Sequence, residues 1–336
     1  MQHQPVLLNE ILEYLVPSRP DGTLVDATVG LGGHSEALLE RHPEVRLIGI
    51  DRDPEALERS RQRLSRFGDR VTLVRGRHES LIDILKQSGN RFLGSSEFLG
   101  SSGDAGHAEE LRGTPRNPEE LKISGILADL GVSSMQLDDA ARGFSFRFDA
   151  PLDMRMGPEG KSAADLVNEL DEYELTKILR DYGEEPMARR IARAIVHARV
   201  TGPIATTTQL ADVIKSVKKQ RYGEIDPSTL TFQALRIAAN EELVGLEQFA
   251  DDAVSALEAN ARVAIISFHS LEDRIIKRAF RRLEGECTCP PNMPVCGCGA
   301  KAEIRQLTGR PLTASEDELK TNPRSRSAKL RVAEKL

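Results

Sequence analysis

The 336-residue sequence has no apolar run that approaches the roughly 20 residues needed for a transmembrane helix. Its N-terminus also lacks a basic segment followed by an apolar one, which is the pattern of a secretory signal peptide. These two absences favour a cytoplasmic protein with no membrane partner. The composition, 39% apolar and 29% charged, is that of an ordinary globular chain and excludes a disordered or fibrous one.

Cysteine is scarce, and all four cysteines fall in one short segment. They form two pairs, Cys287-Thr-Cys289 and Cys296-Gly-Cys298. A reducing cytoplasm disfavours disulfides, and four thiolates this close together could bind a structural zinc ion. The spacing is tighter than the Cys-x-x-Cys of most zinc sites, so a zinc site and a segment without metal both stay open. The functional site that we expect contains no metal.

Positive charge is not in excess, because the formal net charge is −6. This balance disfavours a protein that binds nucleic acid over its whole surface. Lysine and arginine are nevertheless concentrated in residues 189–221, 274–282 and 320–331. Each run taken alone is explained by a solvated face. Three such runs on an acidic chain favour a confined site for a polyanion.

Alternating strand and helix patterns predict a parallel, doubly wound α/β sheet in the first third of the chain. Strands are expected at residues 23–28, 46–50, 71–75, 125–130, 262–268 and 330–333. Residues 162–260 show helical patterns instead, including 184–199 and 231–242, and two further helices are expected over 54–66 and 271–283. The simplest architecture is an α/β sheet interrupted by an all-helical insertion.

Residues 88–121 differ from both parts, because they are rich in glycine and serine and nearly repeat one phrase. We interpret them as a flexible surface insertion, with a functional lid as the alternative. The expected division of the chain is a first part of the sheet domain over 1–140, a helical insertion for substrate recognition over 141–255, and the rest of the sheet domain over 256–336.

Polar or glycine residues follow all five of the strands that are expected to be parallel. These segments are Val29-Gly-Leu-Gly-Gly-His34, Asp51-Arg-Asp53, Gly76-Arg-His78, Asp129-Leu-Gly131 and Ser267-Phe-His-Ser270. Open parallel sheets bind ligands beyond the carboxyl ends of their strands. The five segments together therefore predict one ligand site at this edge of the sheet.

The glycine-rich loop at residues 30–33 lets backbone approach a ligand closely. A dinucleotide-binding loop would carry a third glycine where Ser35 stands. That departure, together with Asp26, fits S-adenosylmethionine better, since this cofactor has no pyrophosphate to place at a helix N-terminus. Asp51 is expected to accept hydrogen bonds from its ribose hydroxyls, with helix capping as the alternative role.

Eleven ordered motifs resemble those of the bacterial ribosomal RNA small-subunit methyltransferase H (MraW) family, and they cover nearly the whole chain except 88–121. They are His3-Gln-Pro-Val-Leu-Leu8, Gly32-Gly-His-Ser35, Ile50-Asp-Arg-Asp-Pro54, Asp129-Leu-Gly-Val-Ser-Ser134, Gln136-Leu-Asp138, Arg142-Gly-Phe-Ser-Phe146, Pro151-Leu-Asp-Met-Arg-Met156, Tyr182-Gly-Glu-Glu185, Thr231-Phe-Gln-Ala-Leu-Arg236, Ser267-Phe-His-Ser-Leu-Glu-Asp-Arg274 and Asn322-Pro-Arg-Ser-Arg326.

The resemblance implies a class I S-adenosylmethionine-dependent methyltransferase fold with a helical substrate domain inserted in it. The implied activity is methylation of the N4 amine of a cytidine in the decoding region of 16S rRNA during maturation of the small ribosomal subunit. The implied partner is 16S rRNA or that subunit. Cofactor contacts are implied at Gly32, Gly33, His34, Asp51, His78, Asp129 and Gln136.

A cytosine amine is a poor nucleophile, because its lone pair is delocalised into the ring. The enzyme must align the amine with the methyl donor and accept hydrogen bonds from its N–H groups. Asp129 is our first candidate for that acceptor, with cofactor binding alone as the alternative. His269 is the second catalytic candidate. Its alternative is structural, since Ser270 and Asp273 resemble a capping box.

The segment after Asp129 lacks the Pro-Pro-aromatic sequence by which other amine methyltransferases hold a base. Phe144, Phe146 and Phe148 are candidate stacking partners, although their alternation equally suits a strand with one apolar face. Two rival functions stay open: a small-molecule methyltransferase or NAD-linked enzyme, and a non-enzymatic RNA-binding assembly factor with a retained cofactor pocket. The basic runs disfavour the first, and an intact Asp51 and Asp129 disfavour the second.

Overall fold

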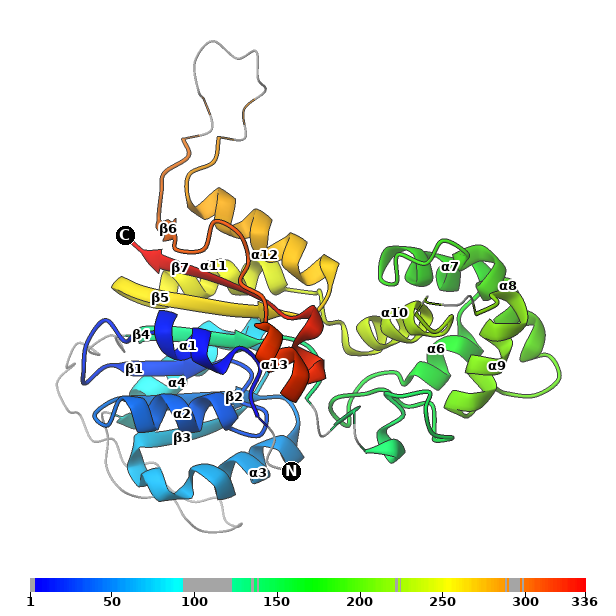
Figure 1. Ribbon diagram of the computed structural model, residues 1–336, viewed down its shortest axis with the longest axis horizontal. Helices are drawn as coiled ribbons and strands as arrows, with labels where there is room; N and C mark the ends of the chain where they lie inside the picture. Colours follow the sequence, from blue (N-terminus) through cyan, green and yellow to red (C-terminus); the bar gives the residue numbers. More distant parts are fainter. Residues whose placement is uncertain are drawn as a thin grey trace, which may run out of the picture.

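The computed structural model of the chain describes residues 4–92, 123–133, 136–137, 139–220, 223, 225–287, 289, 297 and 299–336. Figure 1 shows two bodies side by side, a sheet covered by helices and a separate group of helices. Within the described ranges, no helix has both the length and the apolar character required to cross a membrane.

One sheet contains the described strands in the order β3-β2-β1-β4-β5-β7-β6. They are β1 (Thr23–Asp26), β2 (Arg46–Asp51), β3 (Val71–Arg75), β4 (Ile123–Asp129), β5 (Leu257–Ser267), β6 (Ile304–Gln306) and β7 (Lys329–Lys335). Strands β1 to β5 are parallel, whereas β7 runs antiparallel to both β5 and β6. This confirms the expected class I methyltransferase fold. The sequence pattern missed β6, which is only three residues long.

Helices cover both faces of the sheet. On one face lie α1 (Leu8–Tyr14), α2 (Gly33–Arg41) and α3 (Pro54–Leu64), and on the other α4 (Leu81–Phe92), α11 (Leu246–Ala256) and α12 (Ser270–Leu283). Strand β5 shows why both layers are needed. Val263 and Ile265 belong to one buried cluster, and Ala264 and Ile266 belong to the other. A parallel strand buried on both faces reads as an uninterrupted apolar run.

The shorter elements of the sheet part connect these layers. They are η1 (Ser65–Arg70), η2 (His78–Ser80), α13 (Glu316–Thr321) and η4 (Pro323–Ser327). Helix α3 begins where the sequence predicts, with Asp53 as its N-cap accepting from the backbone N–H of Glu55 and with Pro54 in the first turn.

The helical part has its own apolar core. After η3 (Ala140–Arg142) it contains α6 (Ala163–Glu169), α7 (Glu172–Asp181), α8 (Ala188–Ala198), α9 (Thr207–Val217) and α10 (Thr229–Asn240). Three of these helices begin at reciprocal capping boxes, with Ser162, Asp171 and Thr206 as the N-caps. Such boxes satisfy backbone donors that the first helical turn leaves unpaired.

Several element boundaries differ from the expected ones. Helix α8 begins at Ala188 rather than at 184, since Glu184 has a left-handed backbone (φ 48°) and Pro186 follows it. Strand β5 begins at Leu257, five residues before the expected start. Helix α4 continues to Phe92 and so enters the segment expected to be a flexible insertion. The rest of that segment, residues 93–121, lies outside the described residues.

Helix α11 belongs to the sheet by its packing. Its apolar residues Leu246, Phe249 and Val254 lie in the same buried cluster as β4 and β5, while the core of the helical part ends with α10. We therefore place the end of the helical insertion before α11 rather than at residue 255.

Replacing Phe280 by alanine is expected to lower the free energy of unfolding of the sheet part by about 3–5 kcal/mol, because this fully buried ring leaves a cavity between α12 and the sheet. Phe148→Ala is the matched control. This ring is 55% exposed, so the change should stay within about 0.5 kcal/mol. Denaturant titration followed by circular dichroism measures both values. Equal effects of the two substitutions would contradict the packing described here.

Candidate active site

A cavity of about 650 Å³ opens at the carboxyl ends of the five parallel strands. Its wall contains residues from the segments that follow β1, β2, β3, β4 and β5, together with Met156, Arg236 and Glu242 from the helical side. The strand-end segments singled out in the sequence therefore do meet in one place. Their meeting point is where an open parallel sheet binds its ligand.

Most of the residues expected to contact a cofactor line this cavity: Gly33, His34, Asp51, His78, Asp129 and Gln136. Gly32 does not line it, but its left-handed backbone (φ +73°) turns the chain into α2. At Gly33 a Cβ atom would come within 2.6 Å of Pro5 Cγ. The two glycines are thus required for different reasons, one for a backbone conformation and one for a close approach.

Asp51 is held in place by two backbone donors. Its Oδ2 accepts from the N–H of Gly30 at 2.8 Å, and its Oδ1 accepts from the N–H of Asp53 at 2.9 Å. Burial raises the pKa of Asp51, and these two bonds oppose that effect. Each oxygen keeps a further acceptor position, so the carboxylate is oriented yet still able to bind hydroxyl groups.

Gln136 lines the cavity while both ends of its amide bind protein groups. Its Nε2 donates to Asp53 Oδ2 at 2.9 Å, and its Oε1 accepts from the N–H of Ser133 at 3.0 Å. Arg142 Nη2 donates to the same Asp53 oxygen at 3.2 Å. Asp53, buried at the start of α3, thereby joins the segment after β2 to the segment after β4. The sequence placed Asp53 in a strand-end segment but did not predict this link.

Asp129 presents an unsatisfied acceptor at the cavity. Its Oδ1 is buried and has no hydrogen-bond partner among the described residues. Its other oxygen lies 3.8 Å from His34 Nδ1, and the opposite ring nitrogen of His34 lies 2.8 Å from the carbonyl oxygen of Val6. An unpaired buried oxygen is costly unless a ligand donor completes it.

Buried carboxyl groups near Asp129 influence its protonation. Burial, followed by the nearby carboxyls of Asp26 and Glu272, raises the pKa of Asp129 well above its usual range. Burial likewise raises the pKa of Asp26 to about 6, although Ser35 Oγ and the N–H of Thr28 donate to it. Burial lowers the pKa of His78, whose ring packs edge-on against Phe249.

His269 lies at the start of α12 and is not part of the cavity wall. Its Nδ1 accepts from the backbone N–H of Glu272 at 3.4 Å, while Glu272 Oε2 accepts from the N–H of His269 at 3.3 Å. The capping box therefore forms one residue earlier than the Ser270 and Asp273 pair suggested by the sequence. Ser270 Oγ donates to Glu184 instead, and Asp273 pairs with Arg331.

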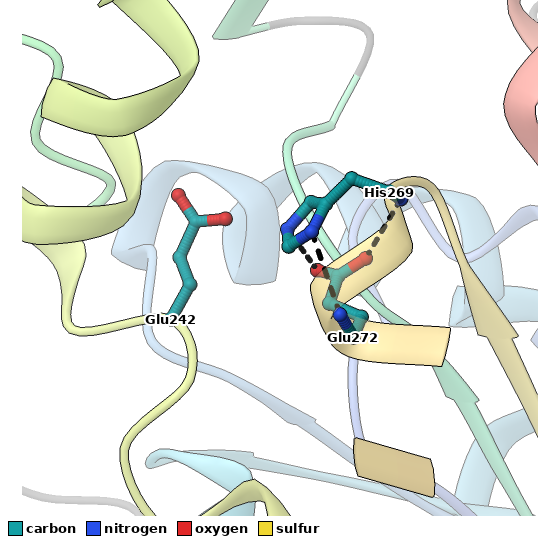
Figure 2. Close-up of side chains that lie close together, drawn as sticks. All are labelled: Glu242, His269 and Glu272. Carbon is teal, nitrogen blue, oxygen red and sulfur yellow. Dashed lines mark hydrogen bonds and ion pairs between the residues drawn. The ribbon is translucent and has the colours of Figure 1, made fainter. Parts of the chain in front are cut away.

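Figure 2 shows Glu242, from the segment after α10, approaching His269 and Glu272 at the start of α12. The three side chains offer metal-ligand atoms within 4.8 Å of one another. Because Nδ1 of His269 accepts from a backbone N–H, a neutral ring carries its proton on Nε2, which lies 3.2 Å from Glu272 Oε1. A metal-bound histidine has the opposite arrangement, with the second nitrogen donating. The orientation of the His269 ring therefore does not suit a metal ligand.

The same cluster contains Arg236, which the sequence did not single out as a site residue. Its Nε and Nη2 donate to the two carboxylate oxygens of Glu242 at 2.9 and 2.8 Å. Burial alone would raise the pKa of Glu272, but His269 and Arg236 outweigh it and the net effect lowers that pKa. The cavity wall thus holds Glu272 ionised close to Asp129, whose pKa is raised. The position of Arg236 beside Glu242 and Glu272 depends on how the two bodies pack, which the sequence does not show.

The three candidate stacking rings all lie outside the cavity wall. Phe144 is buried in the helical part, Phe146 packs edge-to-face on Phe232 at 5.0 Å, and Phe148 is exposed. No strand forms over residues 144–148 either. Phe268, directly after β5, is the phenylalanine that does line the cavity, so its ring becomes the candidate partner for a base.

Comparison with known proteins decides the family. The family model described as the MraW methylase family matches residues 1–336. The chain belongs to this family. It is 49% identical over 340 residues to the ribosomal RNA small subunit methyltransferase H of Heliobacterium mobile, covering 99% of both chains. It is 48% identical over 338 residues to the protein of the same name from Trichlorobacter lovleyi, covering 99% of this chain and 98% of the relative. The resemblance inferred from eleven motifs is confirmed.

In this member of the MraW methylase family, most of the basic runs lie away from the cavity. On α8, Arg189 and Arg193 lie within ion-pair distance of Glu172. On α12, Arg274 pairs with Glu184, and Arg282 pairs with Asp251 and Glu247. Only the last run, 320–331, contributes arginines to the described cavity wall, namely Arg324 and Arg326.

None of the described cysteines lines the cavity. Cys287 and Cys289 are described, and the backbone N–H of Cys289 donates to the sulfur of Cys287 at 3.4 Å. Cys296 and Cys298 lie outside the described residues. A zinc site at this segment therefore stays a prediction.

Asp26→Asn is expected to flatten the pH dependence of stability. The native pKa of Asp26 is about 6 against an ordinary 3.8, so the native state binds the proton more tightly than the unfolded chain does. Wild type should therefore lose about 3 kcal/mol relative to the variant as the pH rises through this interval, and no more above it. Unfolding titrations between pH 4 and pH 8 measure the difference. The exposed Asp69→Asn is the control, and parallel curves for Asp26→Asn and wild type would contradict the burial argument.

Proposed function

We propose that this protein transfers a methyl group from S-adenosylmethionine to the N4 amine of a cytidine in the decoding region of 16S rRNA. The reaction takes place in the cytoplasm during maturation of the small ribosomal subunit. Membership of the MraW methylase family and the names of its full-length relatives support this. The observation that carries it is Asp129, with one unpartnered carboxylate oxygen in the wall of a cavity at five strand ends.

The cavity fits a nucleoside-type cofactor beside a base. Its volume of about 650 Å³ falls within the roughly 300–1,000 Å³ of small-molecule sites. Asp51 would bind the ribose hydroxyls, and Gly33, His34, His78 and Gln136 would line the rest of the cofactor. S-adenosylmethionine supplies an electrophilic methyl group on a sulfonium, which needs no metal for its transfer.

Asp129 performs the acid–base part of the reaction. Its Oδ1 accepts a hydrogen bond from the N4–H group and so orients the amine toward the methyl donor. As the nitrogen becomes tetrahedral, the ionised carboxylate accepts the proton that the amine loses. The raised pKa of Asp129 makes this group a stronger base than an ordinary aspartate. His34, anchored on the Val6 carbonyl, borders the second carboxylate oxygen and limits its rotation.

His269 and Phe268 have supporting roles in this proposal. His269 fixes Glu272 through the capping box, which makes it a positioning residue rather than a group that contacts substrate. Phe268 offers its ring as a surface for the cytosine, an interaction worth about 1–3 kcal/mol per base in other proteins.

The direct test is incubation with methyl-labelled S-adenosylmethionine and undermethylated small ribosomal subunits, followed by mass spectrometry of the nucleosides. Labelled N4-methylcytidine is expected. Asp129→Asn should lower kcat/KM by about 10²–10⁴-fold, because the amide cannot accept the proton. Asp69→Asn, at an exposed position of η1, should match wild type.

Calorimetric titration of the cofactor completes this test. Unchanged cofactor affinity in Asp129→Asn supports the catalytic role, whereas a parallel loss of affinity assigns Asp129 to cofactor binding alone. Wild type that binds the cofactor but labels no nucleoside would contradict the proposed function and favour the non-enzymatic assembly factor.

Asp51→Asn is expected to weaken cofactor binding by roughly 10–100-fold, the effect of losing a charged hydrogen-bond acceptor. The amide can keep only one of the two backbone hydrogen bonds that orient this side chain. Calorimetry measures the affinity, and methylation at saturating cofactor measures kcat. Loss of kcat with unchanged affinity would be inconsistent with a ribose-binding role for Asp51.

A further inference from the structure

The cavity wall is exposed to solvent at two segments of the described chain. Its exposed members are Arg147, Pro323, Arg324, Arg326 and Ser327. Exposed residues in the wall of a cavity stand at its opening, so these residues form the mouth. Three of the five are arginines, which we call the mouth arginines (Arg147, Arg324 and Arg326). Neither proposed catalysis nor cofactor binding uses them.

The mouth arginines come from both bodies, and each lies next to a residue that packs or hydrogen-bonds within its own body. Arg147 belongs to the helical part and directly follows Phe146, whose ring packs on Phe232 of α10. Arg324 and Arg326 belong to η4 and flank the fully buried Ser325, whose Oγ donates to the carbonyl of Asn322 at 2.7 Å. The opening is therefore bordered by the helical part on one side and by the C-terminal segment of the sheet part on the other.

The remaining arginines of the cavity wall are already bound to protein groups. Arg52 donates to the Asn240 carbonyl, Arg77 pairs with Glu79, and Arg236 pairs with Glu242. In contrast, no described carboxylate lies within ion-pair distance of Arg147 or Arg326. The positive charges of Arg147 and Arg326 are thus available to an anion from outside, unlike the paired arginines of α8 and α12.

We propose that the mouth arginines bind the backbone phosphates on either side of one nucleotide, whose base enters the cavity. This rests on the proposed function and adds how the RNA is held. An enzyme that reacts with a base takes it out of its stack into a pocket, which leaves the flanking phosphates at the opening. Arg147 holds the backbone on the side of the helical part, and Arg324 and Arg326 hold it on the side of η4. Guanidinium groups suit this task because they bind phosphate oxygens in pairs.

The test compares the triple variant Arg147→Gln, Arg324→Gln, Arg326→Gln with wild type in full-length protein. Binding of undermethylated small-subunit RNA is measured by filter retention at several salt concentrations. The slope of log K against log salt should become shallower by about 2, since each phosphate contact contributes about 0.7–0.9. The KM for the RNA substrate should rise roughly tenfold or more, with kcat and cofactor affinity unchanged.

Two further variants control for charge and for folding. Arg189→Gln, Arg190→Gln, Arg193→Gln on α8 removes the same charge away from the cavity wall and should leave the salt slope near that of wild type. The triple lysine variant of the mouth arginines keeps the charge and should keep most of the slope. It also shows, by its melting temperature, that η4 tolerates substitution.

A wild-type slope and KM in the glutamine variant would overturn the proposal, as would an equal loss in the α8 variant. A loss of cofactor affinity without a change in RNA binding would assign the mouth to the cofactor instead. Failure of the proposed function would give a different result from failure of this proposal. Wild type would then show a salt slope that the glutamine variant loses, yet form no N4-methylcytidine.

Discussion

Strand β1 pairs in parallel with β2 on one side and with β4 on the other, so the strand order reverses at this point of the sheet. The connection from β1 to β2 covers one face through α2, and the connection from β4 to β5 ends with α11 on the other face, so a crevice opens between β1 and β4. The glycine loop, Asp51 and Asp129 all stand at the rim of this crevice. Because the parallel strands end at one edge of the sheet, the glycine loop and Asp129 lie close together although they are far apart in the sequence.

The helical part completes the crevice because hydrogen bonds and ion pairs attach it to the same edge. Arg142 reaches Asp53 at the start of α3, and Arg52 donates to the carbonyl of Asn240 at the end of α10. These contacts join backbone or buried groups, which are more restrictive than pairs between two solvated side chains. The sheet thus forms the floor of the cavity, and the helical part contributes to its wall.

Environment gives different properties to carboxyl groups of similar chemistry. Asp129 is buried close to Asp26 and Glu272, and this raises its pKa, whereas His269 and Arg236 stabilise the charge of Glu272. Neighbouring acids with pKa values shifted in opposite directions are the arrangement by which active sites separate a proton acceptor from a fixed charge. In this molecule the separation depends first on His269 and then on Arg236, which belongs to the helical part.

Local sequence determined the parallel strands, the position of Asp51 and Asp129 at strand ends, and the Asp53 cap of α3, because periodicity and capping act over a few residues. The tertiary structure decided between overlapping local signals. At α12 the capping box formed at His269 and Glu272, while Ser270 and Asp273 were taken by Glu184 and Arg331 from distant segments. It likewise decided which arginines of the basic runs face the cavity. Such choices depend on how two bodies pack, since side chains far apart in the chain become partners only when both backbones are in place.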